Sequence, residues 1–170
     1  LGFLFRTSIV YCLKVCIFFK KTKFIVQNKD DEVLFIKDFK FNKDLITVIR
    51  GSGIDLRNYK YHPEIIKKEV NIAYAGRILE DKGIIWMIKA FKEAKKICPN
   101  IKLFIAGSLD EENPTSLKKR YFESLIDCDE IFYLGNVLDI NKFWRESNIA
   151  ILLSKREGLP LSLLEAASVG

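Results

Sequence analysis

The sequence is poor in histidine and in proline, and it lacks a C-x-x-C pair. His62 is the only histidine among 170 residues, and the four cysteines include no C-x-x-C pair. Structural zinc sites need several Cys and His ligands at characteristic spacings, so the sequence does not support a zinc site of the usual kind. The cysteines are predicted to be reduced, buried thiols. With only four prolines and 49% hydrophobic residues, the composition also excludes a disordered chain. The length suffices for one sizeable core or for parts of two.

The formal net charge is +6. This excess is too dilute to indicate a nucleic-acid groove, but it suits a protein that meets phosphates or an anionic membrane surface. Residues 1–19 are mostly apolar, yet Arg6 and Lys14 interrupt them, so a membrane span or signal peptide is disfavoured. A core-facing helix is predicted here. A membrane-surface helix is the alternative, because lysines follow directly at positions 20, 21 and 23.

Short elements follow in the first third of the chain. A strand at 24–26, a helix at 33–39 and a strand at 45–49 are predicted from apolar runs and helix-start residues. The second strand ends at Gly51-Ser52-Gly53, where glycine allows a sharp turn or a close approach to a ligand. Position 56 is Leu where a dinucleotide fingerprint requires Gly, so an oxidoreductase of that type is disfavoured.

The rest of the chain alternates between strands and helices after a polar linker that contains His62, which we expect to be an exposed loop residue rather than a catalytic base. Strands are predicted at 70–75, 102–106, 131–133 and 149–153, and helices at 83–97, 116–127 and 141–147. Such alternation predicts an α/β fold with a parallel sheet and right-handed crossovers. Ligands of these sheets bind at the carboxyl ends of the strands.

Two of the strand-to-helix loops carry residues suited to a phosphorylated ligand. The last strand leads through Glu157 and Gly158 to Pro160, which is typical of the first turn of a helix. A helix N-terminus offers free N–H groups and partial positive charge to phosphate or sugar oxygens. In the loop after the strand at 70–75, Arg77 and Lys82 are donors suited to phosphate. The alternative for this loop is a solvated surface on which Glu80 and Asp81 neutralise the two cations.

The pattern Ser154-x-x-Glu157-Gly-x-Pro160-x-x-x-x-Glu165-Ala resembles the signature of retaining glycosyltransferases of family 4, which have the GT-B fold. Gly76-Arg77-hydrophobic-x-x-x-Lys82-Gly resembles a second motif of that family. The motifs look like those of bacterial enzymes that add hexoses or N-acetylhexosamines to polyprenyl-linked or capsular glycans. The resemblance covers roughly residues 23–170.

The resemblance implies a role for each matching position in binding a nucleoside diphosphate sugar. Arg77 and Lys82 would hold the donor diphosphate, Glu165 would bind the ribose, and Glu157 would be the catalytic carboxylate or a ligand of the donor sugar. The weaker expectations are backbone contacts from Gly158, Leu159 and Leu161 to the donor, a nucleobase near Val137, and an interdomain glycine loop at Gly51 and Gly53. No metal and no cofactor are expected.

We therefore predict an incomplete GT-B enzyme with Rossmann-like parallel sheets and helices on both faces. Residues 1–55 would be a remnant of the N-terminal acceptor-side domain, 56–69 the linker, and 70–170 an incomplete nucleotide-sugar-binding domain. The predicted function is transfer of a hexose or N-acetylhexosamine, from a UDP-sugar by preference, to a lipid-linked or polysaccharide acceptor with retention.

This length of chain alone is expected to be inactive, because half of the cleft would be missing. The expected location is the cytoplasm, with peripheral contact to the inner membrane face left open; no nucleic-acid partner is expected. Two alternatives remain: a non-catalytic α/β interaction module with a basic membrane-facing surface, and a GT-B sugar-nucleotide epimerase.

Overall fold

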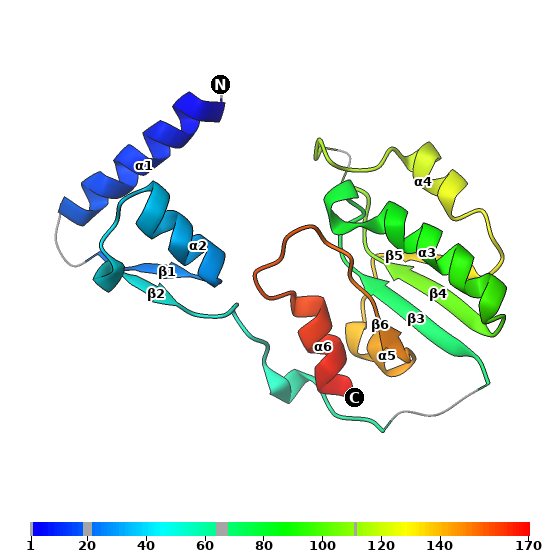
Figure 1. The fold of residues 1–170 in the computed structure, drawn as a ribbon. Coiled ribbons are helices and arrows are strands. Elements are labelled where there is room, and N and C mark those ends of the chain that lie inside the picture. The colour runs from blue at the N-terminus through cyan, green and yellow to red at the C-terminus, as the bar shows by residue number, and fades with distance from the viewer. Residues whose placement is uncertain (1, 19–21, 64–67, 111) are drawn as a thin grey trace. The chain divides into compact units, whose positions relative to one another are not determined.

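The computed structural model describes residues 2–18, 22–63, 68–110 and 112–170 (Figure 1). The chain divides into two compact units, Leu1–Gly53 and Ile54–Gly170, which are taken one at a time below. None of the helices within those described ranges is long and apolar enough to span a bilayer.

The described residues of the first unit form a two-stranded parallel sheet and several helical segments. Its elements are α1 (Gly2–Phe18), β1 (Phe24–Val26), α2 (Lys29–Val33), a π-helical turn (Leu34–Asp38), a 3-10 turn (Lys43–Leu45) and β2 (Ile46–Val48). The helix predicted at 33–39 begins earlier, at Lys29, because the side chain of Asn28 accepts a hydrogen bond from the N–H of Asp31 at 2.7 Å and caps it there. Val26, Phe41 and Ile46 form the small core.

Helix α1 is only partly the core-facing helix that the sequence predicted. Leu13 and Ile17 pack against the small core, whereas Tyr11 and Phe18 are 69% and 84% exposed. The cysteine prediction is half right. All four are free thiols, but Cys12, Cys16 and Cys98 are exposed and Cys128 is half-buried, so the expected burial was wrong.

The second unit is a four-stranded parallel sheet with the strand order β5-β4-β3-β6. Its elements are a 3-10 turn (Leu56–Asn58), β3 (Val70–Ala75), a 3-10 turn (Glu80–Lys82), α3 (Ile84–Ile97), β4 (Ile101–Ala106), α4 (Lys119–Leu125), β5 (Ile131–Gly135), α5 (Ile140–Arg145), β6 (Ile149–Ala150) and α6 (Leu161–Val169). The predicted α/β fold with a parallel sheet is confirmed. Strand β6 is shorter than the predicted 149–153, although Ile151 still donates its N–H to the Ala73 carbonyl at 2.9 Å.

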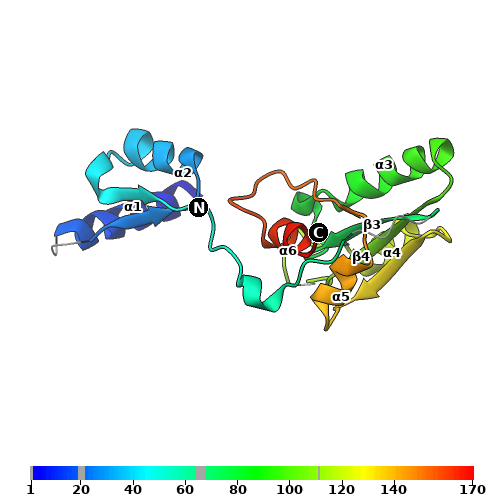
Figure 2. The same ribbon diagram turned by 90° about the horizontal axis from the view of Figure 1, so that it is seen from below.

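Helices cover both faces of this sheet. Successive side chains of a strand point to opposite faces. Accordingly, Tyr74 and Ile105 pack with Ile88 of α3 and Phe122 of α4, in a cluster that is buried almost completely. The other face has smaller strand residues, such as Ala73, which pack against α5 and α6. Figure 2 shows α3 and α5 on opposite sides of the sheet.

The described part of the polar linker packs on the second unit. Tyr59 lies against the cluster formed by α5 and α6, and the N–H of His62 donates to the carbonyl of Val169 at 2.6 Å. The linker is therefore attached to the α5 and α6 side of the sheet at Tyr59 and His62. Positions 64–67 of the predicted linker lie outside the described residues.

Candidate active site

A hollow of about 210 Å³ lies at the carboxyl end of the second unit's sheet. It is bordered by the end of β3, the loop after β3, and the segment that runs from β6 into α6. Its lining residues are Tyr74, Ala75, Gly76, Arg77, Lys82, Leu152, Glu157, Pro160, Leu161 and Ser162. The structure therefore brings together Arg77, Lys82 and Glu157, as the parallel sheet predicted, while Glu165 is absent from the lining.

Close backbone contacts hold these loops in place. Gly83 ends the loop after β3 with φ +74°, and a Cβ atom at this position would overlap the carbonyl of Leu153 beyond β6. Glycine satisfies both the left-handed backbone and the close approach. The N–H of Lys155 also donates to the Asp81 carbonyl at 3.0 Å. The two loops that carry the candidate residues are therefore in direct backbone contact.

Lys82 and Glu157 form an ion pair inside the hollow. Nζ of Lys82 lies 2.5 Å from Oε1 of Glu157, and each side chain is about one-quarter exposed. Burial opposes ionisation of Glu157, but the hydrogen bond and charge of Lys82, together with the side chain of Ser154, outweigh it, so the pKa of this carboxyl lies below its ordinary value. Glu157 is thus an anion at neutral pH.

Arg77 is held from two sides. Its Nη1 lies 3.6 Å from Oδ2 of Asp110 in the loop after β4, and its carbonyl accepts a hydrogen bond from the Tyr74 hydroxyl at 2.8 Å. Burial, with the nearby charge of Glu157, raises the pKa of Tyr74, so its hydroxyl remains a donor. The Arg77 side chain is still 57% exposed, so its guanidinium is accessible to a ligand.

The carboxylates beside the two cations are not those weighed from the sequence. Glu80 and Asp81 were the candidates for neutralising Arg77 and Lys82. In the structure Asp81 instead lies 3.5 Å from Lys155. The partners of the cations come from other loops, which makes the cluster a meeting point of three strand ends rather than one solvated loop.

Helix α6 begins at the hollow. Pro160 occupies the residue before its first turn, with φ −71° and ψ 117°, and Leu161 and Ser162 line the hollow. The first N–H groups of a helix lack partners within it, so this terminus can receive an anion. Gly158 and Leu159 belong to the approach to α6 but are not lining residues.

Glu165 lies one helical turn beyond Leu161 and contacts the linker and α5. Its Oε1 accepts from the Tyr59 hydroxyl at 2.9 Å, and its Oε2 accepts from Nε1 of Trp144 at 3.3 Å. Burial and the carboxylate of Glu165 raise the pKa of Tyr59 to about 12, so the tyrosine stays a donor. Glu165 therefore has two neutral donors that the sequence did not reveal.

The sequence around the hollow matches a known protein family. Residues 57–170, which contain the whole hollow and its ion pairs, match the model of the family "Glycosyl transferases group 1". The chain belongs to the glycosyl transferases group 1 family. The region matched is the one that holds Arg77, Lys82 and Glu157.

The chain is also similar to curated bacterial glycosyltransferases. The chain is 25% identical to the capsular polysaccharide biosynthesis glycosyltransferase CapM of Staphylococcus aureus, over 97% of this chain and 46% of that protein. It is 27% identical to a Campylobacter jejuni N,N'-diacetylbacillosaminyl-diphospho-undecaprenol alpha-1,3-N-acetylgalactosaminyltransferase, over 80% of this chain and 37% of the enzyme. The chain thus spans less than half the length of these two curated relatives.

Solved glycosyltransferases share the fold. HepE from Anabaena, in complex with UDP and glucose, superimposes with a TM-score of 0.69 at 18% identity, over 86% of this chain and 42% of HepE. WaaG, a glycosyltransferase of lipopolysaccharide biosynthesis, gives the same TM-score over 88% of this chain and 42% of its own. The predicted GT-B-type α/β architecture is confirmed by these likenesses.

The weaker sequence predictions have separate positions in the structure of this family member. Val137 packs, half-buried, against the cluster that includes Trp144. Gly51 and Gly53 belong to the first unit and have φ of +66° and +69°, which suits glycine at a turn. Contacts of these residues with a ligand stay predictions.

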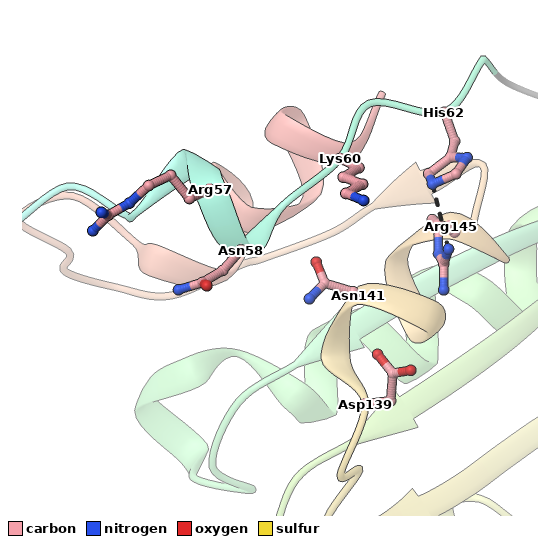
Figure 3. A pocket seen from close by; sticks show the side chains of 7 residues that line it. All are labelled: Arg57, Asn58, Lys60, His62, Asp139, Asn141 and Arg145. Carbon is pink, nitrogen blue, oxygen red and sulfur yellow. Dashed lines mark hydrogen bonds between the residues drawn. The ribbon is translucent and has the colours of Figure 1, made fainter.

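A second hollow, of about 260 Å³, lies between the linker and α5. Its lining residues, shown in Figure 3, are Arg57, Asn58, Lys60, His62, Asp139, Asn141 and Arg145. The side chain of Arg57 is directed away from the other six. Nη1 of Arg145 lies 3.3 Å from Nε2 of His62. Because arginine can only donate, Nε2 of His62 is the acceptor of this hydrogen bond. His62 is exposed, as expected, and lies outside the lining of the first hollow.

Four residues that complete the candidate site were missed from the sequence: Tyr59, Tyr74, Asp110 and Trp144. Tyr74 had a detectable signal, since it is a hydroxyl-bearing residue near the carboxyl end of an otherwise apolar strand. Asp110 lies in the acidic loop after β4, and its role as the partner of Arg77 depends on the conformation of that loop. The contacts of Tyr59 and Trp144 with Glu165 join segments that are distant in sequence, so no local sequence pattern predicts them.

Proposed function

We propose that the enzyme to which this chain belongs transfers a hexose or N-acetylhexosamine from a nucleoside diphosphate sugar to a lipid-linked or polysaccharide acceptor. We further propose that it is a family 4 enzyme, retains the anomeric configuration and uses UDP-sugars without a metal. The observation that carries the proposal is the convergence of Arg77, Lys82 and Glu157 on one hollow at the start of α6. The names of the relatives support the acceptor class.

The two cations suit the leaving diphosphate. Arg77 presents a guanidinium that can form paired hydrogen bonds with phosphate oxygens, and Lys82 supplies a compact charge beside it. The N-terminus of α6 adds partial positive charge at the same place. Donors held in fixed positions stabilise the charge that develops as the glycosidic bond breaks, which is usually the largest contribution to such catalysis.

Glu157 suits the sugar. Its low pKa keeps it ionised at neutral pH, so it acts as an acceptor for a sugar hydroxyl or stabilises positive charge on the sugar ring, and it does not act as a general acid. Its pairing with Lys82 places the carboxylate beside the proposed diphosphate site. The ribose is assigned to Glu165, one turn along α6, and the nucleobase to the neighbourhood of Val137.

The proposal is tested by calorimetric titration of the 170-residue chain with UDP, UMP and uridine. If the cations hold the diphosphate, UDP binds at least about tenfold more tightly than UMP, which corresponds to one charge-assisted hydrogen bond. Equal affinities for UDP and UMP would contradict the proposed role of the hollow in binding the diphosphate. Parallel titrations with ADP, GDP and CDP test the choice of base.

The reaction itself requires an enzyme that joins this chain to an acceptor domain. Mass spectrometry of its products over a panel of nucleotide sugars identifies donor and acceptor, and the anomeric coupling constant of the product tests retention. Conversion of a nucleotide sugar without any acceptor would instead indicate an epimerase. Sedimentation with anionic liposomes, in the absence of nucleotide binding, would indicate an interaction module.

A further inference from the structure

The carboxylate of Glu165 is supported by two side chains from two different segments. Tyr59 approaches Oε1 from the linker, at 2.9 Å, and Trp144 approaches Oε2 from α5, at 3.3 Å. Both oxygens are therefore fixed, and the plane of the carboxylate is set by donors that do not belong to α6. A glutamate on a helix surface is usually mobile and solvated, so this arrangement is specific to the site.

The two donors leave acceptor capacity unused. An ionised carboxylate offers about four lone-pair positions, two on each oxygen. Tyr59 and Trp144 use one on each oxygen, so each oxygen retains one. A vicinal diol such as that of ribose has two hydroxyls, each of which can donate one hydrogen bond to one of these oxygens.

Charge pairing does not account for the arrangement. Among the ion pairs between described residues, none includes Glu165. Its two partners are neutral, since Trp144 has no charge and the raised pKa of Tyr59 keeps that hydroxyl protonated. Neutral donors orient the carboxylate without cancelling its charge, so the anion remains available to hydroxyl donors of a ligand.

We infer that Tyr59 and Trp144 are positioning residues that orient the Glu165 carboxylate so that its two remaining lone pairs accept the ribose hydroxyls of the donor. The inference rests on the proposed function, which assigns the ribose to Glu165. It adds that the linker, through Tyr59, contributes to recognition of the nucleotide. The part of the ligand that these residues recognise is the ribose diol, and 2'-deoxyribose lacks the 2'-hydroxyl of that diol.

Tyr59→Phe is the direct test, because it removes only the hydroxyl and keeps the ring in its cluster. UDP and 2'-deoxy-UDP are titrated into the wild-type chain and the variant. We expect the wild type to prefer UDP about tenfold, and the variant to lose about fivefold in affinity for UDP but less than twofold for 2'-deoxy-UDP. A merely structural tyrosine would weaken both ligands equally, and that result would overturn the inference.

Tyr61→Phe is the matched control. Tyr61 lies two residues along the same linker, is 72% exposed, and should leave both affinities unchanged. In a Glu165→Gln background, Tyr59→Phe should cause no further loss of discrimination, because the group that it orients no longer accepts two hydroxyls. A further loss in that background would show that Tyr59 acts independently of Glu165.

Trp144→Phe provides a second variant, with thermal unfolding as a check because Trp144 is only 4% exposed. We expect a folded variant to lose discrimination between UDP and 2'-deoxy-UDP, as Tyr59→Phe does. The outcomes separate the two proposals. A chain that binds UDP better than UMP but does not distinguish UDP from 2'-deoxy-UDP overturns this inference alone, whereas a chain that does not bind UDP overturns the proposed function.

Discussion

Nζ of Lys82 lies 2.5 Å from Oε1 of Glu157, although 75 positions separate the two residues in the chain. The pair joins the loop after β3 to the loop after β6 at the wall of the hollow. It therefore sets the position of a cation and an anion before any ligand arrives. A diphosphate near Lys82 would meet an ammonium group that is already oriented.

The pair predicts a specific dependence of stability on acid. Because the pKa of Glu157 is depressed on folding, its contribution is fully present above the unfolded value of about 4.5 and is lost as the pH falls through the lower folded value. Glu157→Gln should lower the free energy of unfolding at pH 7 by about 1 kcal/mol or less, the range of a pair that is partly open to water. Urea denaturation between pH 3 and pH 7 checks this prediction. The free energy of unfolding of Glu157→Gln should depend less on pH than that of the wild type.

Glu93→Gln is the control for that measurement. Glu93 pairs with Lys96 at 2.7 Å on the exposed face of α3, where both side chains are about 70% exposed. Water screens such a pair, so its loss should leave the pH profile unchanged. Similar profiles for both variants would contradict the importance of the Lys82 pair.

Arg77→Ala should weaken UDP binding while leaving uridine binding unchanged. Removing one charge-assisted hydrogen-bond donor to the diphosphate costs about 2 kcal/mol, or roughly thirtyfold in affinity. Titration calorimetry measures both ligands. Arg120→Ala removes an exposed arginine from α4 and serves as the control. A wild-type UDP affinity in Arg77→Ala would refute the diphosphate role of this residue.

Asp110→Asn acts in the opposite direction on the same guanidinium. Oδ2 of Asp110 lies 3.6 Å from Nη1 of Arg77, so we expect this carboxylate to compete with an anionic ligand for the guanidinium. Removing the carboxylate charge should raise the affinity for UDP severalfold at low salt, and the gain should shrink as ionic strength rises. An unchanged UDP affinity at low salt would show that Asp110 does not compete with the ligand.

Tyr74→Phe should weaken UDP binding by displacing the backbone of Arg77. The hydroxyl donates to the Arg77 carbonyl at 2.8 Å, and its loss leaves that carbonyl without this donor, at a cost of about 1 kcal/mol in stability. Unfolding by urea and titration with UDP measure the two effects. Tyr133→Phe is the control and should change neither quantity. Tyr133 is an exposed residue of β5, and a phenylalanine there keeps the ring contact with Phe122. A Tyr74→Phe chain as stable as the wild type would contradict the prediction.

The elements of the second unit could be predicted because their signals are local. The apolar run of β3 and the amphipathic pattern of α3 each span enough residues to be recognised, and alternation of such segments implies a parallel sheet. The same argument placed Arg77, Lys82 and Glu157 at one edge, because the carboxyl ends of parallel strands share an edge. Those three residues do line one hollow.

The partners of these residues could not be predicted. Pairing of Arg77 with Asp110, or of Glu165 with Tyr59, depends on rotamers and loop paths that neighbouring residues do not determine. The helical start at Lys29 was missed for another reason, since capping by Asn28 extended the helix beyond its apolar residues. Exposure of Cys12 and Cys16 shows that residue type alone does not decide burial.

The approach of Gly83 to the Leu153 carbonyl yields the last prediction. Gly83→Ala must adopt φ near +74° and also displace the backbone after β6, whereas Gly135→Ala, at φ +62°, has no atom within 4 Å of the new Cβ. The backbone strain is about 1 to 2 kcal/mol in both variants. Of these two variants, Gly83→Ala alone also has the steric overlap, so it should be destabilised by at least about 3 kcal/mol. It should also bind UDP more weakly, because the displaced segment leads to Glu157. Urea unfolding compares the two, and equal losses of stability would show that the loops can separate freely.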